Sequence, residues 1–557
     1  MKVGIFITLI GASLASFGAP LKVGSPRVEH RVNPVGVSSS PRFSWHLISE
    51  ERSKRQIGYQ ILAASKKELL SEDKADLWNS SAVKSGHRKL ILWKGKELKD
   101  GQTVFWKVRV TDESKEVGEW SEVAQFTVGT ESTLDQPVRI SGFESSSPEL
   151  NKLYQDSITI LEKRLSAFAK GEITALGDGA DLQLSAREYL YHFDSVSHLS
   201  QWIRLMDAGR TKEGFFPVQP GSKNFGSVSS DAAITVHYPV WRMGGDDAFV
   251  KSRWTIFEEY MMAREKADQK FEGHKWSGYS ARDVTPEFLD LTNLGYTTRL
   301  IRFLSTPAQE PLNVIRFKDF AARIRASFKE QYLTEEFSLK TPSQTAQLLA
   351  LRCGVLPENK KEQKIPEYQE TIIKNLLASL KKDGPQVGPI GAHFLLQVLP
   401  LIGAQDEAIR LVLDLTEEQR STFLGKGTTE WMMSQLAGID AASRGFDEVR
   451  IAPRIPASDS IKWVKAHHDS VAGRIGSRWE KLEGGGLKLE ISIPAGIVSR
   501  VLLPIKKGQS ITESGKDINV AGKKGKDTEA EGVTILGQSD TFVSLITQSG
   551  DYSFEIR

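Results

Sequence analysis

The sequence contains a single cysteine, Cys353, among 557 residues. One cysteine cannot form a disulfide within the chain, and it excludes zinc sites built from paired cysteines. Neither sign of charge is in clear excess, because 73 basic and 70 acidic side chains leave a formal net charge of +3. This balance argues against nucleic acid or a membrane surface as the partner. The sequence also lacks a glycine-rich phosphate loop and a serine nucleophile elbow, so we expect no cofactor.

Long hydrophobic runs are missing beyond the first twenty residues. Residues 1–19 carry a basic residue, Lys2, near their start. They are apolar from Val3 to Ile10 and continue through small residues, which is typical of a secretory signal peptide. The alternative is an uncleaved membrane anchor, for which the segment is short. We therefore expect an exported protein, secreted or periplasmic, with no further membrane contact.

The remaining chain is too long for one hydrophobic core, so several domains are expected. Residues 20–129 alternate short apolar runs with turn residues, as in RFSWHL and TVFWKVRVTD, and predict an antiparallel β-sandwich. The pattern becomes helical within residues 130–455 and returns to short strands within residues 456–557. The predicted fold class is a multidomain α+β protein with a β-sandwich, a helical domain and a second β-sandwich. Periodicity alone cannot decide whether the helices form a solenoid or a closed ring.

Two segments of the helical region carry carboxylates in polar surroundings. Residues 169–194 read AKGEITALGDGADLQLSAREYLYHFD and include Glu172, Asp178 and Asp181, while residues 427–432 read GTTEWM and include Glu430. A loop rich in Asp and Gly is more often a simple turn, and that reading stays open.

Both segments resemble those of the bacterial α-L-rhamnosidases, glycoside hydrolase family 78. The first resembles the pattern D-C-P-Q-R-E-x-L-G-W-x-G-D-A-Q-x-x-A-R followed by Y-x-F-D, and the second resembles G-A-T-T-x-W-E. The residues in register with the first pattern are Leu176, Gly177, Asp181, Gln183, Ala186, Arg187, Tyr191, Phe193 and Asp194. The resemblance implies an N-terminal fibronectin-like β-sandwich, a central (α/α)6 toroid and a C-terminal β-sandwich.

The chain departs from the family pattern at both catalytic positions. The family's acid falls on Thr174 and its base on Met432, and neither side chain can transfer a proton at neutral pH. A stretch that normally follows Trp431 is also shortened. The implied reaction, inverting glycoside hydrolysis, needs two carboxyls about 6.5–9.5 Å apart, one as acid and one as base. Four carboxyls are therefore candidates for a relocated acid and base: Asp181, Glu172, Asp178 and Glu430. Glu188, which follows Arg187, is a further acid of the same segment that could take the acid's role.

Several other side chains are candidates for binding a sugar. They are polar groups or aromatic rings of the helical region, and all but Trp276 lie in segments that resemble the family: Arg187, Asp231, Trp241, Trp276, His393 and Trp431. Asp231 is equally well placed to cap a helix, and each tryptophan is equally well suited to the core. His467 and His468 are neighbours in a predicted strand and point to opposite faces, so we expect no metal site there.

The resemblance implies an exported α-L-rhamnosidase-like glycoside hydrolase that acts on rhamnose-containing oligosaccharides or polysaccharides. Two alternatives remain open. The chain could be a carbohydrate-binding relative without turnover, or a polysaccharide lyase on the same scaffold. Convergence of Glu172 or Asp178 with Glu430 across one site would favour hydrolysis.

Overall fold

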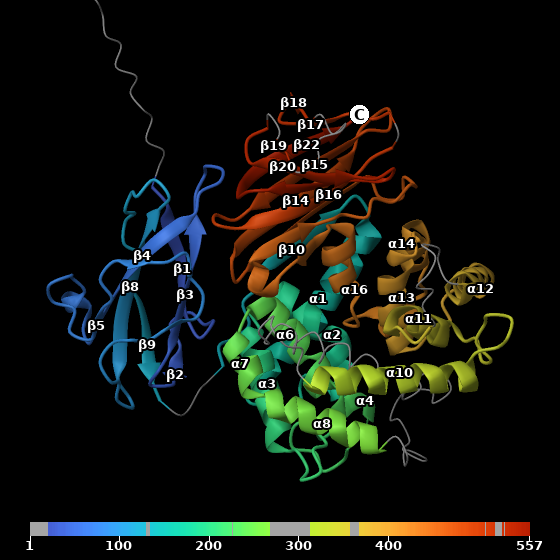
Figure 1. Ribbon diagram of the computed structural model, residues 1–557, viewed down its shortest axis with the longest axis horizontal. Helices are drawn as coiled ribbons and strands as arrows, with labels where there is room; N and C mark the ends of the chain where they lie inside the picture. The colour runs from blue at the N-terminus through green and yellow to red at the C-terminus, as the bar shows by residue number, and fades with distance from the viewer. Residues whose placement is uncertain are drawn as a thin grey trace, which may run out of the picture.

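The computed structural model describes residues 20–129, 134–225, 227–267, 312–356, 367–506, 508–518, 526–527 and 530–557. Two β-sheet regions and a helical region are arranged around each other (Figure 1). The N-terminal sheets stand to one side, and the helices lie against the C-terminal sheets.

The N-terminal β-sandwich consists of two sheets. The smaller has the order β1 (Lys22–Val28), β3 (Arg42–Ile48), β7 (Ile91–Leu92). The larger has the order β2 (Val35–Val37), β9 (Ala124–Val128), β8 (Thr103–Asp112), β4 (Gln56–Ala64), β5 (Trp78–Asn79), with β6 (Val83–Lys84) also paired to β4. The 3-10 helix η1 (Lys67–Leu69) follows β4. Burial alternates residue by residue along β8, as a period of two requires, and Trp106 lies fully buried in the core.

The helical region contains the following described helices: α1 (Pro148–Ala169), α2 (Gly179–His192), α3 (Val196–Ala208), α4 (Ser227–Ser230), α5 (Ala232–Thr235), α6 (His237–Gly244), α7 (Asp247–Ser252), α8 (Trp254–Ala267), α10 (Leu312–Tyr332), α11 (Gln344–Cys353), α12 (Glu367–Asp383), α13 (Pro389–Leu401), α14 (Gln405–Leu413), α15 (Glu417–Phe423), α16 (Thr428–Trp431) and the π-helix η2 (Met432–Leu436). Helix α1 begins at Pro148, and the Ser147 hydroxyl accepts the N–H of Leu150 at 3.2 Å. Within the described ranges, no helix has the length and apolar character needed to span a bilayer.

The C-terminal sandwich has a seven-stranded and a six-stranded sheet. The first has the order β10 (Ser141–Ser145), β13 (Trp463–Ser470), β14 (Gly473–Lys481), β15 (Leu487–Ile493), β22 (Gly550–Ile556), β17 (Ile511–Glu513), β18 (Lys516–Asp517). The second has the order β11 (Ile439–Ala441), β12 (Glu448–Ile451), β16 (Val498–Pro504), β21 (Phe542–Thr547), β20 (Val533–Gln538), β19 (Lys526–Asp527), and the 3-10 helix η3 (Arg444–Phe446) lies between β11 and β12.

Strands from both ends of the helical region belong to these C-terminal sheets. Strand β10 precedes α1 yet pairs with β13, with Ser141 opposite His468. Strands β11 and β12 follow the last helix. The sequence pattern predicts a helical region over residues 130–455, and the strands at both ends depart from that pattern because short runs give little periodicity to read. On β13, His468 is buried and His467 is partly exposed, as alternation predicts.

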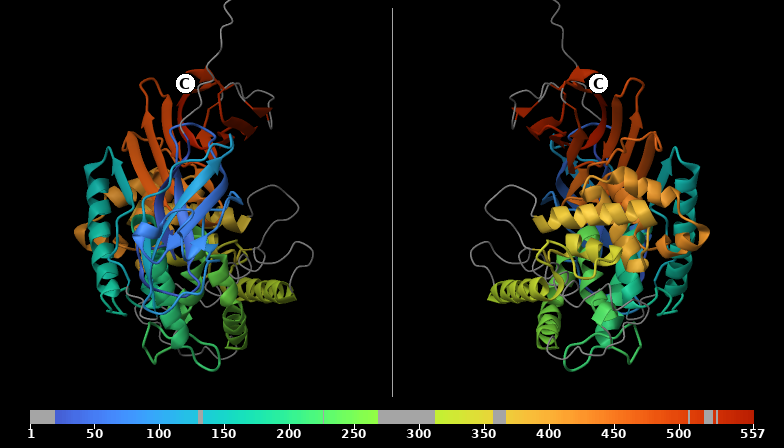
Figure 2. Two further views of the ribbon diagram at one scale, coloured as in Figure 1. Left: turned by 90° about the vertical axis from the view of Figure 1, so that its left-hand side faces the viewer. Right: turned by 90° about the vertical axis from the view of Figure 1, so that its right-hand side faces the viewer.

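One continuous hydrophobic core joins the helices to the C-terminal sandwich, and the N-terminal sandwich has a separate core. Seen from its own side, the N-terminal sandwich lies in front of the other two regions (Figure 2, left). It contacts both of them. Arg42 reaches Asp246 of the helical region at 2.7 Å, and Arg52 reaches Glu513 of the C-terminal sandwich at 2.7 Å. The candidate site lies within the shared core region, where α2, α13 and α16 meet.

Candidate active site

Helix α2 forms one wall of the site. Asp178 is its N-cap, and the Asp178 carboxylate accepts the backbone N–H of Asp181 at 2.9 Å. Gly179 permits the close approach of α4, because a Cβ atom there would lie 1.9 Å from the Ser229 carbonyl oxygen. The sequence thus fixes where α2 begins, and the helix carries Asp181, Arg187 and Glu188 toward the chain around α16.

Asp181 forms an ion pair with Lys426, which lies just before α16. The Asp181 side chain is 35% exposed and that of Lys426 is 11% exposed, so the carboxylate lies at the edge of solvent. An ion-paired carboxylate of this kind can still accept hydrogen bonds from sugar hydroxyls.

Arg187 links two further carboxylates. Its Nη1 donates to Oε1 of Glu430 at 2.7 Å, and its Nη2 donates to Oδ1 of Asp440 at 2.8 Å. Burial alone would raise the pKa of Asp440, but the guanidinium groups of Arg187 and Arg450 outweigh burial, so this pKa is lowered. Asp440 is therefore a fixed anion that orients Arg187 toward Glu430.

His393 and Gln397 hold Glu430 from helix α13. His393 Nδ1 donates to the carbonyl oxygen of Lys426 at 3.1 Å, since a carbonyl can only accept. Its Nε2 then accepts a hydrogen bond from the Gln397 amide at 2.8 Å, and that amide also lies 3.5 Å from Oε1 of Glu430. Burial lowers the pKa of His393, so this imidazole is neutral and acts as a fixed hydrogen-bonding group.

Gly427 is the residue that lets the chain pass beside His393. Its φ of +92° lies in the left-handed region, and a Cβ atom there would lie 2.3 Å from Nδ1 of His393. Only glycine fits both conditions. The turn it forms directs Thr429 and Glu430 toward α2.

Glu188 is a buried acid of α2 that faces the same turn. It is 0% exposed, and its Oε1 accepts both the N–H of Thr429 at 2.8 Å and the Thr429 hydroxyl at 2.7 Å. Burial raises the pKa of Glu188 to about 7, and the nearby Glu430 raises it as well, against hydrogen bonds from Gly427 and Thr429.

The four carboxyl candidates from the sequence have different positions. Asp181 and Glu430 join the network around Lys426 and Arg187. Asp178 caps α2, and Glu172 is exposed in the turn after α1. Within the described residues, no contact joins Glu172 or Asp178 to Glu430, so the convergence considered above is not found. Asp181 is linked to Glu430 indirectly, through Lys426, His393 and Gln397.

The sugar-binding candidates also separate into two groups. Arg187 and His393 belong to the network, whereas Asp231 is buried against Tyr260, with Arg264 4.0 Å away, and its side chain makes no capping bond to α5. Trp276 lies outside the described residues.

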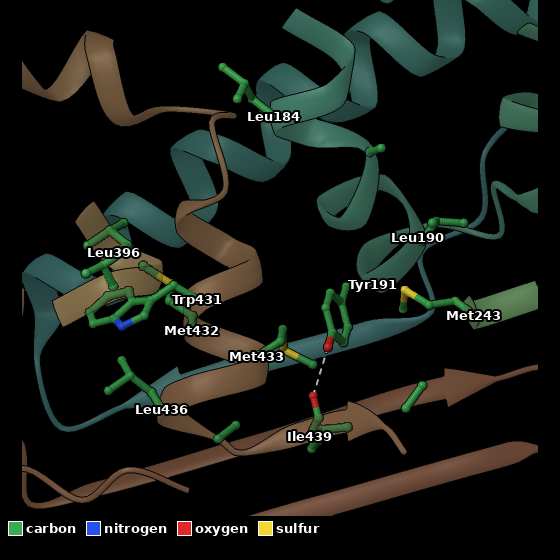
Figure 3. Packing of buried hydrophobic residues seen from close by; sticks show 14 of the residues in the cluster. Leu184, Leu190, Tyr191, Met243, Leu396, Trp431, Met432, Met433, Leu436 and Ile439 are labelled. Carbon is green, nitrogen blue, oxygen red and sulfur yellow. Dashed lines mark hydrogen bonds between the residues drawn. The ribbon is translucent and has the colours of Figure 1, made fainter. Parts of the chain in front are cut away.

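The two described tryptophan candidates are packed in the core. Trp241 is 5% exposed and donates to Asp247 at 2.9 Å, and Trp431 is 1% exposed. Figure 3 shows Trp431, Met432 and Met433 among buried apolar side chains. Met433 lies beside Tyr191, whose hydroxyl donates to the Ile439 carbonyl oxygen at 3.0 Å. Neither ring offers an open face for stacking a sugar.

Three residues of the network were not among the sequence candidates: Gln397, Lys426 and Asp440. Each acts through a partner on a distant segment, so no local pattern marked it. Glu188 was considered as an acid beside Arg187, and the structure places it in the buried interior, where it contacts Thr429. Among the described residues, no group of three or more side chains has the arrangement of a metal site.

Chemically, the network presents two carboxylates held by cations on separate helices. In the described part of the chain, both hydrogen bonds that Glu430 accepts end on Oε1. Among these described contacts, Oε2 accepts no hydrogen bond.

Three family models match the chain in succession. They describe a Rha78A-like, N-terminal immunoglobulin domain at residues 23–132, a bacterial alpha-L-rhamnosidase 6 hairpin glycosidase domain at residues 138–432, and a bacterial alpha-L-rhamnosidase C-terminal domain at residues 438–517. The expected fold class is confirmed.

Known proteins of similar sequence and structure agree with these models. An alpha-L-rhamnosidase of Streptomyces avermitilis is 24% identical over 411 residues, which cover 65% of this chain and 38% of that protein. The solved alpha-L-rhamnosidase of Dictyoglumus thermophilum has a TM-score of 0.80 at 14% identity, covering 96% of this chain and 99% of that one. The Streptomyces avermitilis structure complexed with L-rhamnose has a TM-score of 0.76 at 12% identity, covering 96% and 100%.

At identities of 14% and 12%, the two solved structures establish the fold alone. The matched segments span between 10% and 38% of the length of the curated relatives.

Proposed function

Because the chain belongs to the bacterial alpha-L-rhamnosidase family, we propose that it is a glycoside hydrolase that releases L-rhamnose from rhamnose-containing glycans. One observation carries the proposal. Asp181 of α2 and Glu430 of α16 are held in one network by Lys426, Arg187 and Gln397, although neither of the family's usual catalytic positions carries an acid. The solved relative that contains L-rhamnose supports the choice of sugar.

Glu430 is the proposed base. Its carboxylate is 4% exposed, and Arg187 and Gln397 hold Oε1, which limits how the group can rotate. In the proposed reaction, Oε2 takes a proton from water, and the resulting hydroxide attacks the anomeric carbon as the glycosidic C–O bond breaks. The leaving oxygen gains a proton, so the products are L-rhamnose and the free alcohol.

Asp181 is the second proposed carboxyl. It is the more exposed of the two, and as an anion paired with Lys426 it suits an acceptor of a sugar hydroxyl. To act instead as the proton donor to the leaving oxygen, it would first have to bind a proton, which the ammonium group of Lys426 opposes. The two roles differ in how strongly the rate depends on the leaving group. A proton donor matters most when the departing alcohol is a poor leaving group.

The test is the release of L-rhamnose by the purified protein from p-nitrophenyl α-L-rhamnoside and from a rhamnosyl disaccharide. Glu430→Gln is expected to lower kcat on both substrates by about 10²–10⁴-fold. If Asp181 is the acid, Asp181→Asn should slow hydrolysis of the disaccharide far more than hydrolysis of the nitrophenyl glycoside. If Asp181 accepts a sugar hydroxyl instead, Asp181→Asn should slow both reactions alike. Glu172→Gln is the matched control and should hydrolyse both substrates at the wild-type rate.

The results that contradict the proposal are equally definite. Turnover that survives Glu430→Gln would remove Glu430 as the base. A wild-type protein that binds L-rhamnose by calorimetry but releases none from either substrate would be a carbohydrate-binding relative without hydrolysis.

We further propose that the chain is exported. The support is the apolar segment from Val3 to Ile10 with the small residues that follow it, which lie outside the described ranges. Fractionation of cells that produce the full chain, with N-terminal sequencing of the product, tests this: a product that retains residues 1–19 in the cytoplasm would contradict it.

A further inference from the structure

We infer that Glu188 is a positioning residue that sets the orientation of Glu430 through Thr429; this inference rests on the base role proposed above for Glu430. Glu188 is 0% exposed and so cannot itself reach a substrate. Its contact is with the residue directly before Glu430. Both the backbone N–H and the hydroxyl of Thr429 donate to Oε1 of Glu188, at 2.8 and 2.7 Å.

The pairing between α2 and α16 runs residue by residue. Glu188 holds Thr429, and the adjacent Arg187 holds Glu430 at 2.7 Å. One contact therefore fixes the main chain and the next fixes the side chain. Without the Glu188 contact, the main chain at Thr429 would be less restrained. Arg187 would then hold Glu430 in a segment that moves more freely.

The start of the turn has contacts of its own besides Glu188. The Thr428 hydroxyl donates to the Phe423 carbonyl oxygen at 2.7 Å, and Gly427 packs against His393. A change at Glu188 is thus expected to move Thr429 and Glu430 more than the start of the turn. Such a local displacement lowers the rate of a proton transfer, which depends on sub-ångström geometry, more than it lowers binding.

The charge of Glu188 adds a pH dependence to this contact. The ionisable groups around it are Glu430 on α16, Tyr189 and His192 on its own helix, Arg164 on α1 beside Tyr189, and His393 on α13 beside Glu430. Because burial raises its pKa to about 7, Glu188 loses its proton near neutral pH. Its carboxylate then accepts more strongly from Thr429, since hydrogen bonds to an ionised group are stronger, and holds the turn more firmly.

The experiment compares the kcat of the full chain with that of Glu188→Gln between about pH 5 and 9, using p-nitrophenyl α-L-rhamnoside. Glutamine keeps an acceptor oxygen for Thr429 but cannot ionise. The wild-type kcat should rise about threefold or more through pH 7, and the Glu188→Gln profile should lack this step. Glu149→Gln, an exposed acid of α1, is the control and should keep the wild-type step.

Substitutions at Thr429 test the geometry without altering a charge. Thr429→Val should lower kcat about tenfold while KM changes less than about twofold, and Thr429→Ser should restore most of the rate because it restores the hydroxyl. This pair also carries the test if Glu188→Gln fails to fold. A Glu188→Gln profile identical to that of the wild type, or a Thr429→Val protein with unchanged kcat, would overturn the inference.

Failure of the proposed function would be visible separately. If the wild type releases no rhamnose, the same pH series is measured as the affinity for L-rhamnose by calorimetry. A step near pH 7 that Glu188→Gln lacks then supports the positioning role in ligand binding. Equal curves, or no rhamnose binding at any pH, overturn it.

Discussion

Asp181 and Glu188 lie two turns apart on helix α2, on nearly the same face, yet their surroundings give them opposite roles. Asp181 is 35% exposed and its partner is the Lys426 ammonium. Glu188 is fully buried, and its partners are the hydroxyl and the N–H of Thr429. The comparison shows that two carboxyls on one helix face can differ in burial and partner, and this difference is the basis of the roles proposed for them, one facing a ligand and one supporting Glu430.

The largest difference between the two acids should appear in stability. At pH 6, Glu188→Ala is expected to lower the free energy of unfolding by about 4 kcal/mol, because two buried donors of Thr429 lose their acceptor and a cavity forms. Asp181→Ala should cost less than about 1 kcal/mol, because it removes only a partly exposed ion pair. Urea denaturation of both variants measures the gap, and equal losses would break the comparison.

The pH dependence of stability should also distinguish the two acids. A carboxyl whose pKa is raised to about 7 holds a proton in the folded state that it loses when unfolded, so its contribution falls as pH rises from its ordinary value of 4.5 to about 7. Relative to Glu188→Gln, the wild type should lose roughly 3 kcal/mol over this range. Buried histidines such as His237 and His468, whose pKa values are lowered to about 4, act in the opposite direction and cancel in this difference.

Denaturation at several pH values gives that difference directly. Asp181→Asn is the control for a partly exposed carboxyl of α2. A wild-type minus Glu188→Gln difference that stays constant with pH would contradict the buried, proton-holding state of Glu188.

The turn that presents Glu430 offers a smaller test. Gly427→Ala should destabilise the protein by about 2 kcal/mol, because the left-handed conformation and the contact with His393 both oppose a Cβ atom. Gly425→Ala is the matched control: its φ is also positive, at +65°, but the nearest atom to an added Cβ, in Leu161, is 3.7 Å away. Its cost should be about 1 kcal/mol. Thermal unfolding of the two variants side by side measures the difference.

The smallest effect is expected at Glu172. This residue is exposed in the turn after α1, so Glu172→Ala should change the unfolding free energy by less than about 0.5 kcal/mol. Its rhamnose release should equal that of the wild type. A large loss of turnover would return Glu172 to the catalytic candidates and weaken the contrast between Asp181 and the other acids.

Much of the fold could be predicted because its signals are local. The alternation in β8 and the Ser147-Pro148 start of α1 are visible in a few residues of sequence. The pairing of β10 with β13 could not be predicted, since the partners are separated by the whole helical region and each strand is short.

The site was predictable only in part for the same reason. Asp181, Arg187 and Glu430 lie in segments with a recognisable pattern, whereas Lys426 and Asp440 become relevant only through long-range contacts. The burial of Trp431 could not be predicted from the sequence either. Trp431 follows Glu430 directly but packs its ring into the core, because neighbouring helical residues face different directions.

The central proposal is that Asp181 and Glu430 face one ligand, while the buried Glu188 positions Glu430 through Thr429. The most direct measurement is a crystal structure of the Glu430→Gln protein soaked with L-rhamnose. We predict a sugar whose hydroxyls or ring oxygen lie within hydrogen-bonding distance of both Asp181 and residue 430, with no contact to Glu188. Rhamnose bound away from both residues, or in direct contact with Glu188, would contradict the account.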